Sequence, residues 1–377
     1  MSDEKRDPLV VVKDLHVDFD VRDGIVHAVD GASFNIYRGQ TLGIIGESGC
    51  GKSITAKAIM NMIPKRGKMS GEIIFYEKWK DGTGETINEI RIDQTNPDSE
   101  IIRRIRGGRI AMIFQEPMSS LTPVYTAGFH IMEAVNLHRI AGAKTIGEQM
   151  GENIQKKRGV SEEEAQKIAI DMLRRVGIPN AEKRVNSYPH QLSGGQRQRV
   201  MIAIALSTHP DLLIADEPTT ALDVSIEAQI LDLMRELQKT QDMAIMFITH
   251  NLGVIAEIAD EIVVMYMGKE VERASTIEIF ENPKHPYTRA LLGSIPQIGE
   301  KKDHLQTIEG MVPSPFNLPT GCVFHPRCTE YMPGKCDRVY PEYAEVESGH
   351  WARCLLYDGC WPKTAEAQAI KQPVNSK

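Results

Sequence analysis

The first 115 residues consist of short apolar runs separated by polar and glycine-containing segments. Residues 9–19 and 31–36 alternate apolar and polar positions, with Gly24 and Gly31 as breakers, which predicts two antiparallel strands. Further apolar runs, each long enough for a buried strand, follow at 41–45, 71–76 and 109–114.

The middle of the chain changes to a helical pattern. Residues 117–205 carry little strand signal, and residues 161–176 repeat apolar positions at helical spacing. Ser161 and Glu164 form a capping box at the start of this repeat, and Gly177 ends it. We therefore predict a helical subdomain inserted into an α/β core.

Strand and helix signals alternate again in the next part of the chain. Apolar strands are predicted at 211–217 and 244–249, with an amphipathic helix at 226–237 between them. Residues 262–266 and 269–271 predict a hairpin.

Charge and composition exclude several classes of protein. The chain has 44 Lys and Arg against 51 Asp and Glu, and a net charge of −7 argues against a protein dominated by nucleic-acid phosphate contacts. No apolar run approaches the roughly 18 residues of a membrane-spanning helix, and the polar start lacks a signal-peptide core. We therefore expect a cytoplasmic chain. The polar segment 77–108 predicts an elaborated loop or hairpin, to which we assign no chemistry.

A phosphate-binding loop follows the apolar run that ends at position 45. Residues 46–53 read G-x-x-x-x-G-K-S and open a helix-forming stretch. The glycines of the loop let its N–H groups face a phosphate, and the helix that follows directs its positive end there. Lys52 supplies a positive charge to the phosphates, and the Ser53 hydroxyl is a ligand for Mg²⁺. Cys50 is interpreted as a small loop residue rather than a reactive thiol.

Polar residues also close or follow other predicted strands, where α/β sheets bind ligands. Neighbouring strand residues point in different directions, so we assign Asp216 to Mg²⁺ and Glu217 to the general base that orients water. Gln115 can reach a metal or a water, and His250 can hydrogen-bond a γ-phosphate. Phe19 either stacks on a base or packs in the core, and the sequence leaves both open.

A second glycine-containing loop stands before another predicted helix. Residues 192–196 spell LSGGQ, and such a loop at a helix N-terminus suits an anion. Together and in this order, GESGCGKS, Gln115, LSGGQ, LLIADE, Ala221-Leu222-Asp223 and His250 resemble the ATP-binding subunits of ABC proteins.

This resemblance implies a fold and a set of roles. The fold is an ABC-type P-loop α/β domain with an antiparallel edge sheet and a helical subdomain inserted at about 117–205. Contacts to ATP within the subunit are implied for Phe19, Gly46, Glu47, Ser48, Gly49, Cys50, Gly51, Lys52, Ser53, Ile54, Gln115 and Asp216. Contacts to ATP on an opposite subunit are implied for Ser193, Gly194, Gly195, Gln196 and Asp223. The resemblance also implies that Mg²⁺ is bound by Ser53, Gln115 and Asp216, and that the catalytic residues are Glu217 and His250.

The remaining segment, 281–377, resembles the carboxyl-terminal extension of oligopeptide and dipeptide importer ATPases, whereas 1–280 is assigned to the ATP-binding domain. Five of the six cysteines follow position 320, and in a reducing compartment such clustering indicates a metal or cluster rather than disulfides. Four thiolates suit tetrahedral zinc or an iron–sulfur cluster. The resemblance favours a [4Fe–4S] cluster, with Zn²⁺ as the alternative, and the ligands would be Cys322, Cys328, Cys336 and Cys354. Cys360 could substitute as a ligand.

The resemblance implies an ATPase subunit that powers import of dipeptides or oligopeptides, bound peripherally to the cytoplasmic face of the cell membrane. Its partners would be a second homologous ATPase subunit in a heterodimer, two transmembrane permease subunits and an extracytoplasmic substrate-binding protein, with no nucleic acid. A groove lined by residues 116–135 would pass motion to the permeases. Import of nickel or another small solute is an alternative. A soluble ABC-class ATPase acting on the ribosome or nucleic acid is another, but that class predicts coiled coils, tandem cassettes or a basic tail, which the sequence lacks.

Overall fold

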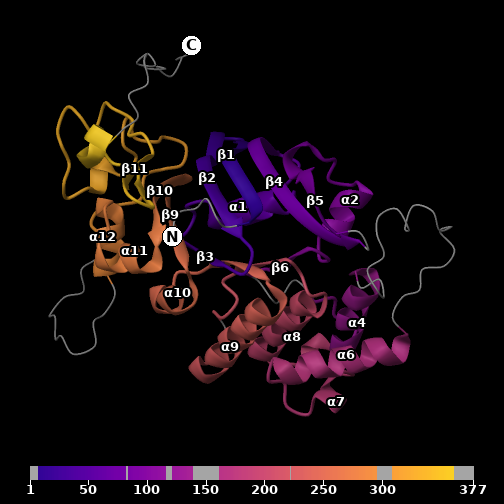
Figure 1. Ribbon diagram of the computed structural model, residues 1–377. Helices are drawn as coiled ribbons and strands as arrows, with labels where there is room; N and C mark the ends of the chain where they lie inside the picture. Colours follow the sequence, from indigo (N-terminus) through magenta and orange to yellow (C-terminus); the bar gives the residue numbers. More distant parts are fainter. Residues whose placement is uncertain are drawn as a thin grey trace.

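The computed structural model of the chain describes residues 7–81, 84–115, 121–138, 161–220, 222–294 and 308–360. Two sheets form its framework (Figure 1). One has four strands in the order β2-β1-β4-β5, and the other has eight in the order β11-β12-β10-β9-β3-β8-β7-β6. No helix among the described residues is long and apolar enough to cross a membrane.

The four-stranded sheet is antiparallel. Its strands are β1 (Pro8–Val21), β2 (Gly24–Tyr37), β4 (Gly67–Asp81) and β5 (Gly84–Arg91). The antiparallel pair predicted from 9–19 and 31–36 is confirmed, and Gly24 lies at its turn. Gly31, however, does not end a strand: β2 continues through it at a φ of 80°, where the pairing with β1 is irregular.

The segment 77–108 is more ordered than an elaborated loop. It contains the end of β4, all of β5, η2 (Ile92–Gln94) and α2 (Glu100–Ile105). Glu77 is fully buried and accepts hydrogen bonds from Arg104 Nη2 at 2.8 Å and Arg109 Nε at 3.0 Å. This carboxylate therefore ties the hairpin to the start of the next strand, which the polar composition did not reveal.

Parallel strands form the centre of the eight-stranded sheet. β3 (Thr41–Ile45) pairs with β8 (Ala244–Ile248) and β9 (Glu261–Tyr266), and β7 (Leu212–Asp216) lies between β8 and β6 (Ile110–Ile113). Every residue of β3, β6, β7 and β8 is buried, which explains their continuous apolar sequence. The hairpin of β9 with β10 (Lys269–Ser275) is also confirmed. Two helices accompany these strands, α1 (Lys52–Ile59) and α10 (Leu252–Ile258).

Helices gather at one end of the molecule, at the lower right of Figure 1. They are α4 (Ala127–His138), α6 (Glu162–Arg175), α7 (Ala181–Arg184), α8 (Gly194–Ser207) and α9 (Val224–Gln241), with the short η3 (Pro189–Gln191) before α8. The helix predicted at 161–176 is confirmed: the Ser161 hydroxyl accepts the Glu164 N–H at 3.3 Å and starts α6. The side chains that α6 buries lie at helical spacing, namely Ala165, Ala169, Met172 and Leu173.

The C-terminal part begins with α11 (Thr276–Glu281) and α12 (Pro286–Gly293) and ends with η4 (His325–Arg327), β11 (Ala344–Glu347), β12 (His350–Ala352) and η5 (Leu355–Cys360). β12 pairs antiparallel with β10 and so extends the central sheet. Phe324 is buried in the same hydrophobic core as Tyr266 of β9 and Tyr287 of α12. The boundary at 280/281 remains a prediction, since sheet and core both continue across it.

Candidate nucleotide site

The phosphate-binding loop connects β3 to α1, where only glycine fits at two positions. Gly46 has a φ of 150°, and a Cβ there would lie 2.2 Å from the Met265 carbonyl oxygen. Gly51 has a φ of 103°, and its Cβ would lie 2.3 Å from the Ala28 carbonyl oxygen. Any side chain at either position would displace the loop from the strands behind it.

Lys52 begins α1 and points back into the loop. Its buried ammonium donates to the carbonyl oxygens of Gly46 at 2.7 Å and Glu47 at 3.0 Å. The positive end of the helix and this ammonium therefore act on the same space.

A cavity of about 250 Å³ opens at this place. Residues from six separate parts of the chain line it: Val26, His27, Ala28, Ser48, Gly49, Gly51, Lys52, Ser53, Ile54, Gln115, Glu217, Met267, Gly268, Pro315 and Leu318. The loop thus shares a cavity with Gln115 and Glu217, as the sequence analysis expected of a nucleotide site. Pro315 and Leu318 come from the C-terminal extension, and no motif marked them.

Asp216 ends β7 close to Ser53. Burial raises the pKa of this carboxyl group, while a hydrogen bond with Ser53 and the charge of Lys52 oppose the shift. Its Oδ1 is buried without a hydrogen-bond partner. A buried carboxylate oxygen with no donor is costly, and beside a hydroxyl it matches the oxygen ligands that Mg²⁺ prefers. The Ser53 and Asp216 pair therefore fits the metal that the sequence assigned to it.

Glu217 follows β7 with a φ of 50°, and its N–H donates to Ile248 at 2.8 Å. Its Oε1 lies 3.2 Å from His250 Nδ1, and its Oε2 accepts from the Thr220 hydroxyl at 3.2 Å. The turn thus directs the carboxylate of Glu217 into the cavity while Asp216 faces Ser53. The ends of two neighbouring strands bring a potential base and an imidazole together.

The LSGGQ loop lies elsewhere. Ser193 caps α8 by accepting the Gln196 N–H at 3.3 Å, and Gln196 Oε1 accepts the Ser193 N–H at 3.1 Å. Ser193 is exposed, and none of these residues lines the cavity. Asp223 is also exposed and caps α9 through the Ile226 N–H at 3.0 Å. The loop therefore presents a helix N-terminus on the surface, where a second chain can reach it.

Two protein families match the chain. The family described as ABC transporter matches residues 29–220, and the C-terminal region of oligopeptide/dipeptide transporters matches residues 271–336. The chain belongs to the ABC transporter family. It is an ABC-type ATPase.

Relatives of this ABC ATPase match nearly its whole length. The dipeptide transport ATP-binding protein DppD of Bacillus subtilis is 42% identical over 349 residues, which are 92% of this chain and 94% of the relative. The oligopeptide transport ATP-binding protein AppD of the same organism is 44% identical over 352 residues, 93% of this chain and 97% of the relative. DppD of Haemophilus influenzae is 43% identical, over 90% and 93% of the two chains.

Solved ABC structures share the fold of the core. The dimeric ABC transporter cassette MJ0796 has a TM-score of 0.58 at 25% identity and covers 71% of this chain and 99% of its own. A post-hydrolysis dimer of the same cassette, bound to ADP and phosphate, has a TM-score of 0.55 at 26% identity with the same coverage.

Phe19 of the ABC ATPase does not share the cavity. It is half-buried, packs against the core of the antiparallel sheet, and would touch any side chain placed at Gly67. The cavity wall nearest to it is made by Val26, His27 and Ala28 of β2. Phe19 pairs across the strands with Val26 of that wall, so core packing and adenine stacking both stay predictions.

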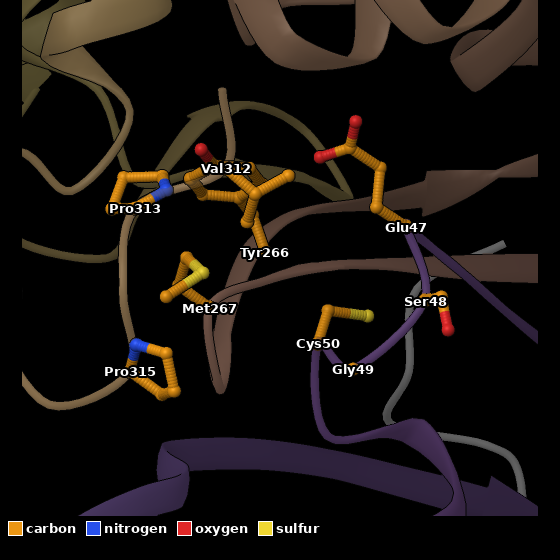
Figure 2. A pocket seen from close by; sticks show the side chains of 9 residues that line it. All are labelled: Glu47, Ser48, Gly49, Cys50, Tyr266, Met267, Val312, Pro313 and Pro315. Atoms are coloured by element: carbon orange, nitrogen blue, oxygen red, sulfur yellow. The ribbon is translucent and has the colours of Figure 1, made fainter.

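Glu47 and Cys50 face a different space. They line a smaller cavity of about 150 Å³ together with Tyr266, Met267, Val312, Pro313 and Pro315 (Figure 2). Burial raises the pKa of the Cys50 thiol, which agrees with a small loop residue rather than a nucleophile. The carboxylate of Glu47 is held by Arg327, a contact that sequence motifs did not reveal because the two residues are far apart in the chain.

The four cysteines of the extension come from separate segments and lie near one another. Burial, together with the charges of the neighbouring thiols, raises the pKa of Cys328 to about 11 and of Cys354 to about 12. Cys322 and Cys336 are also buried, and the Cys322 N–H donates to the Cys336 carbonyl oxygen at 2.8 Å. Cys360 is exposed. Four neighbouring thiols, three of them buried and none in a disulfide, are a donor set suited to a soft metal centre.

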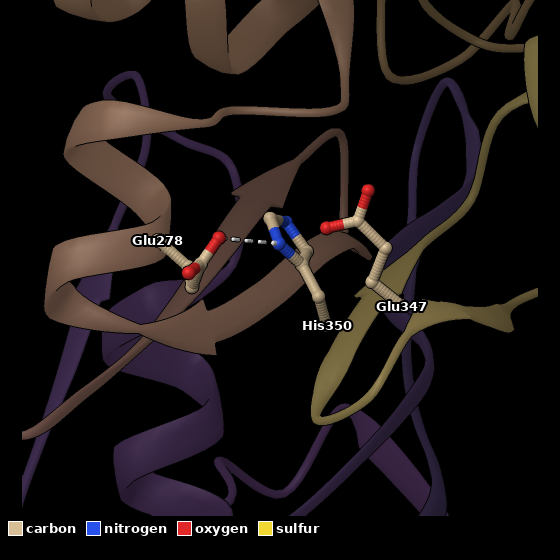
Figure 3. A group of neighbouring side chains, drawn as sticks. All are labelled: Glu278, Glu347 and His350. Carbon is tan, nitrogen blue, oxygen red and sulfur yellow. Dashed lines mark ion pairs between the residues drawn. The ribbon is translucent and has the colours of Figure 1, made fainter.

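No three of the four cysteine sulfurs, all in the described part of the extension, lie within 4.8 Å of one another. Among the described residues, only Glu278, Glu347 and His350 place three candidate ligand atoms within 4.8 Å of one another (Figure 3). Two members of this trio already have other partners. Glu347 pairs with Lys284, and His350 Nε2 lies 2.7 Å from the buried Glu272. We therefore interpret the trio as ion pairing that fastens β12 to the ATPase core.

Proposed function

We propose that this ABC ATPase powers import of dipeptides or oligopeptides as a subunit of an ABC transporter. The observation that carries the proposal is continuous identity of 42–44% with peptide-transport ATP-binding proteins, across both the nucleotide site and the C-terminal region. A likeness limited to the core would support only an ABC ATPase, whereas the region 271–336 is shared with peptide transporters.

The geometry of the cavity supports a hydrolytic mechanism. Lys52 would exchange its loop carbonyl contacts for the β- and γ-phosphates of ATP, and the loop N–H groups would hold the same charge. Ser53 and Asp216 would hold Mg²⁺, with Gln115 at the cavity wall, and the ion would neutralise charge on the phosphates. Glu217 would accept a proton from a water molecule. The oxygen of that water would bond to the γ-phosphorus while the bond from the γ-phosphorus to ADP breaks.

His250 would orient the Glu217 carboxylate and donate a hydrogen bond to the γ-phosphate. Its Nδ1 lies 3.2 Å from Glu217 Oε1, and its ring is largely exposed at the mouth of the site. An imidazole in this position can keep a hydrogen bond to the γ-phosphate while that group separates from ADP.

A second ATPase subunit would complete each site. The start of α8 holds Ser193, Gly194, Gly195 and Gln196 outside the cavity of their own chain, and the two glycines contribute N–H groups that the capping box does not use. We propose that they and Asp223 contact ATP bound to a homologous partner in a heterodimer. Hydrolysis followed by release of phosphate would weaken the contacts that join the two subunits, and the pair would open.

The proposed permease groove coincides with an exposed apolar surface. Its residues 116–120 lie outside the described part of the chain. Beyond them Val124, Tyr125 and Phe129 are 67%, 45% and 41% exposed, and the rings of Tyr125 and Phe129 stack at 4.2 Å. Exposed aromatic side chains of this kind suit a protein partner. We propose that two transmembrane permease subunits bind the heterodimer here, which would hold the ATPase on the cytoplasmic face of the membrane.

We also propose that Cys322, Cys328, Cys336 and Cys354 bind a [4Fe–4S] cluster with a structural role. In tetrahedral zinc sites the sulfurs lie about 3.8 Å apart, as zinc–sulfur bonds of ~2.3 Å dictate. No three of these described thiols approach within 4.8 Å, which supports a larger core. Protein purified without oxygen should be brown and contain about four irons and four sulfides per chain. Stoichiometric zinc without sulfide would overturn the cluster.

Reconstitution with the neighbouring transport subunits tests the proposed import. Vesicles containing the ATPase heterodimer and its permeases, with the binding protein outside, should take up dipeptide or tripeptide only when ATP is inside. The Glu217→Gln variant is the matched control and should abolish uptake. Uptake of nickel without peptide, or co-purification with ribosomes in place of permeases, would contradict peptide import.

A further inference from the structure

An arginine of the C-terminal extension grips the phosphate-binding loop. Arg327 Nη1 lies 2.7 Å from Glu47 Oε2, and Nη2 lies 3.0 Å from Glu47 Oε1, so the pair is bidentate. The arginine side chain is only 3% exposed, and its Nη1 also donates to the Tyr266 hydroxyl at 3.3 Å. Because this contact joins two charged groups through two parallel hydrogen bonds and is shielded from solvent, it is among the stronger kinds of polar interaction.

Glu47 is connected to the extension by its backbone as well. Its N–H donates to the hydroxyl of Tyr287 in α12 at 2.9 Å, and its carbonyl oxygen accepts from Lys52 at 3.0 Å. One residue therefore joins the extension, through Arg327 and Tyr287, to the ammonium that faces the phosphates. A shift of Glu47 would shift Lys52 and the neighbouring N–H groups with it.

The extension also forms part of the walls around the loop. Val312, Pro313 and Pro315 face Glu47 and Cys50 across the smaller cavity (Figure 2). Pro315 also lines the nucleotide cavity. In sequence, Cys328 follows Arg327 directly, so one of the four thiols belongs to the residue next to the arginine that holds the loop.

We propose that the C-terminal extension sets the nucleotide affinity of this ATPase, with Arg327 as the positioning residue. The guanidinium holds Glu47 away from the phosphates and neutralises its carboxylate. Without the guanidinium, an uncompensated negative charge would lie within the loop that must receive a triphosphate. Glu47 would also no longer be fixed, and its carbonyl oxygen would no longer hold Lys52 in place. This inference rests on the ATPase function and is independent of which solute is imported.

Nucleotide affinity of the full-length protein tests the proposal. Calorimetry with Mg²⁺ and the non-hydrolysable analogue AMP-PNP should show the Kd of Arg327→Met raised by about tenfold or more. Adding Glu47→Gln to that variant removes the unpaired carboxylate charge. The double variant should therefore recover at least about a third of the increase in log Kd. Arg338→Met is the matched control, because Arg338 is a 78% exposed arginine of the same extension, and its Kd should stay within about twofold of wild type.

A purely structural pair would give a different pattern. It would lower the melting temperature of Arg327→Met while the folded protein kept its Kd, and the added Glu47→Gln would rescue nothing. An unchanged Kd in Arg327→Met, or a raised Kd that Glu47→Gln does not lower, would overturn the proposal.

Wild-type protein supplies a second measurement if Arg327→Met fails to fold. Coupling is reciprocal, so AMP-PNP should slow hydrogen exchange of the backbone amides at 322–336. Unchanged exchange there, with the loop itself protected, would refute the coupling. Normal AMP-PNP binding without peptide uptake would count against the proposed import alone.

Discussion

Mild acid should weaken the junction between the extension and the ATPase core through His285. This residue caps α12, is 1% exposed, and its Nδ1 accepts the Tyr287 N–H at 3.0 Å. Burial lowers the pKa of the ring to about 4, against the attraction of Glu272, whose carboxylate also accepts the His285 N–H at 2.9 Å. Folded protein thus keeps a neutral ring at pH values where the unfolded chain is already charged.

The size of the effect follows from the two pKa values. The unfolded chain binds a proton below pH ~6.5, whereas the folded chain binds it only below about 4. Stability therefore falls as pH falls between these values, by about 1.4 kcal/mol per pH unit. From pH 7 to pH 5 the free energy of unfolding should drop by about 2 kcal/mol on account of this ring. Hydrogen bonds lower the pKa of Glu272 despite its burial, so its contribution is lost only below the ordinary value of 4.5, outside this range.

Urea unfolding at pH 7 and pH 5 measures the effect in wild type and in His285→Asn. Asparagine keeps a side-chain acceptor at the start of α12 and does not titrate. Subtracting the variant removes groups common to both proteins, including His138, whose pKa burial also lowers. Wild type should lose about 2 kcal/mol more than the variant. Equal losses in both proteins would refute the argument, because a neutral buried ring requires the difference.

Three further substitutions test the site and the sheet. Lys52→Ala should raise the Kd for ATP by at least about tenfold, because the loop loses its positive charge, and normal affinity in equilibrium binding would contradict the loop assignment. Glu217→Gln should retain ATP but slow phosphate release by about 10²- to 10⁴-fold, and unchanged turnover would exclude Glu217 as the base. Glu77→Gln should lower the free energy of unfolding by about 2 kcal/mol, since it leaves Arg104 and Arg109 without their buried carboxylate, and an unchanged urea midpoint would show that the pair is dispensable.

Features carried by neighbouring residues could be predicted from the sequence alone. The G-x-x-x-x-G-K-S spacing, the Ser161 cap and the continuous apolar strands depend on short-range geometry, so each is readable within a few positions. The order of strand ends also placed Gln115 and Glu217 beside the loop, because parallel strands present their carboxyl ends at one edge.

Tertiary structure decided the features that depend on pairing across the chain. Phe19 is half-buried between Gly67 and its cross-strand partner Val26, a placement that alternation of residue types cannot specify. The polar segment around Glu77 forms strand and helix and buries a carboxylate that Arg104 and Arg109 pair with, residues 27 and 32 positions away.

The contact of Arg327 with Glu47 shows the limit most clearly. The two residues are 280 positions apart and meet in a fold in which β12 pairs with β10 and the extension lies against the loop. A salt bridge needs an approach of a few ångströms, and no local pattern encodes that approach when hundreds of residues lie between the partners. The chemistry of the loop was therefore in the sequence, whereas its connection to the extension exists only in the fold.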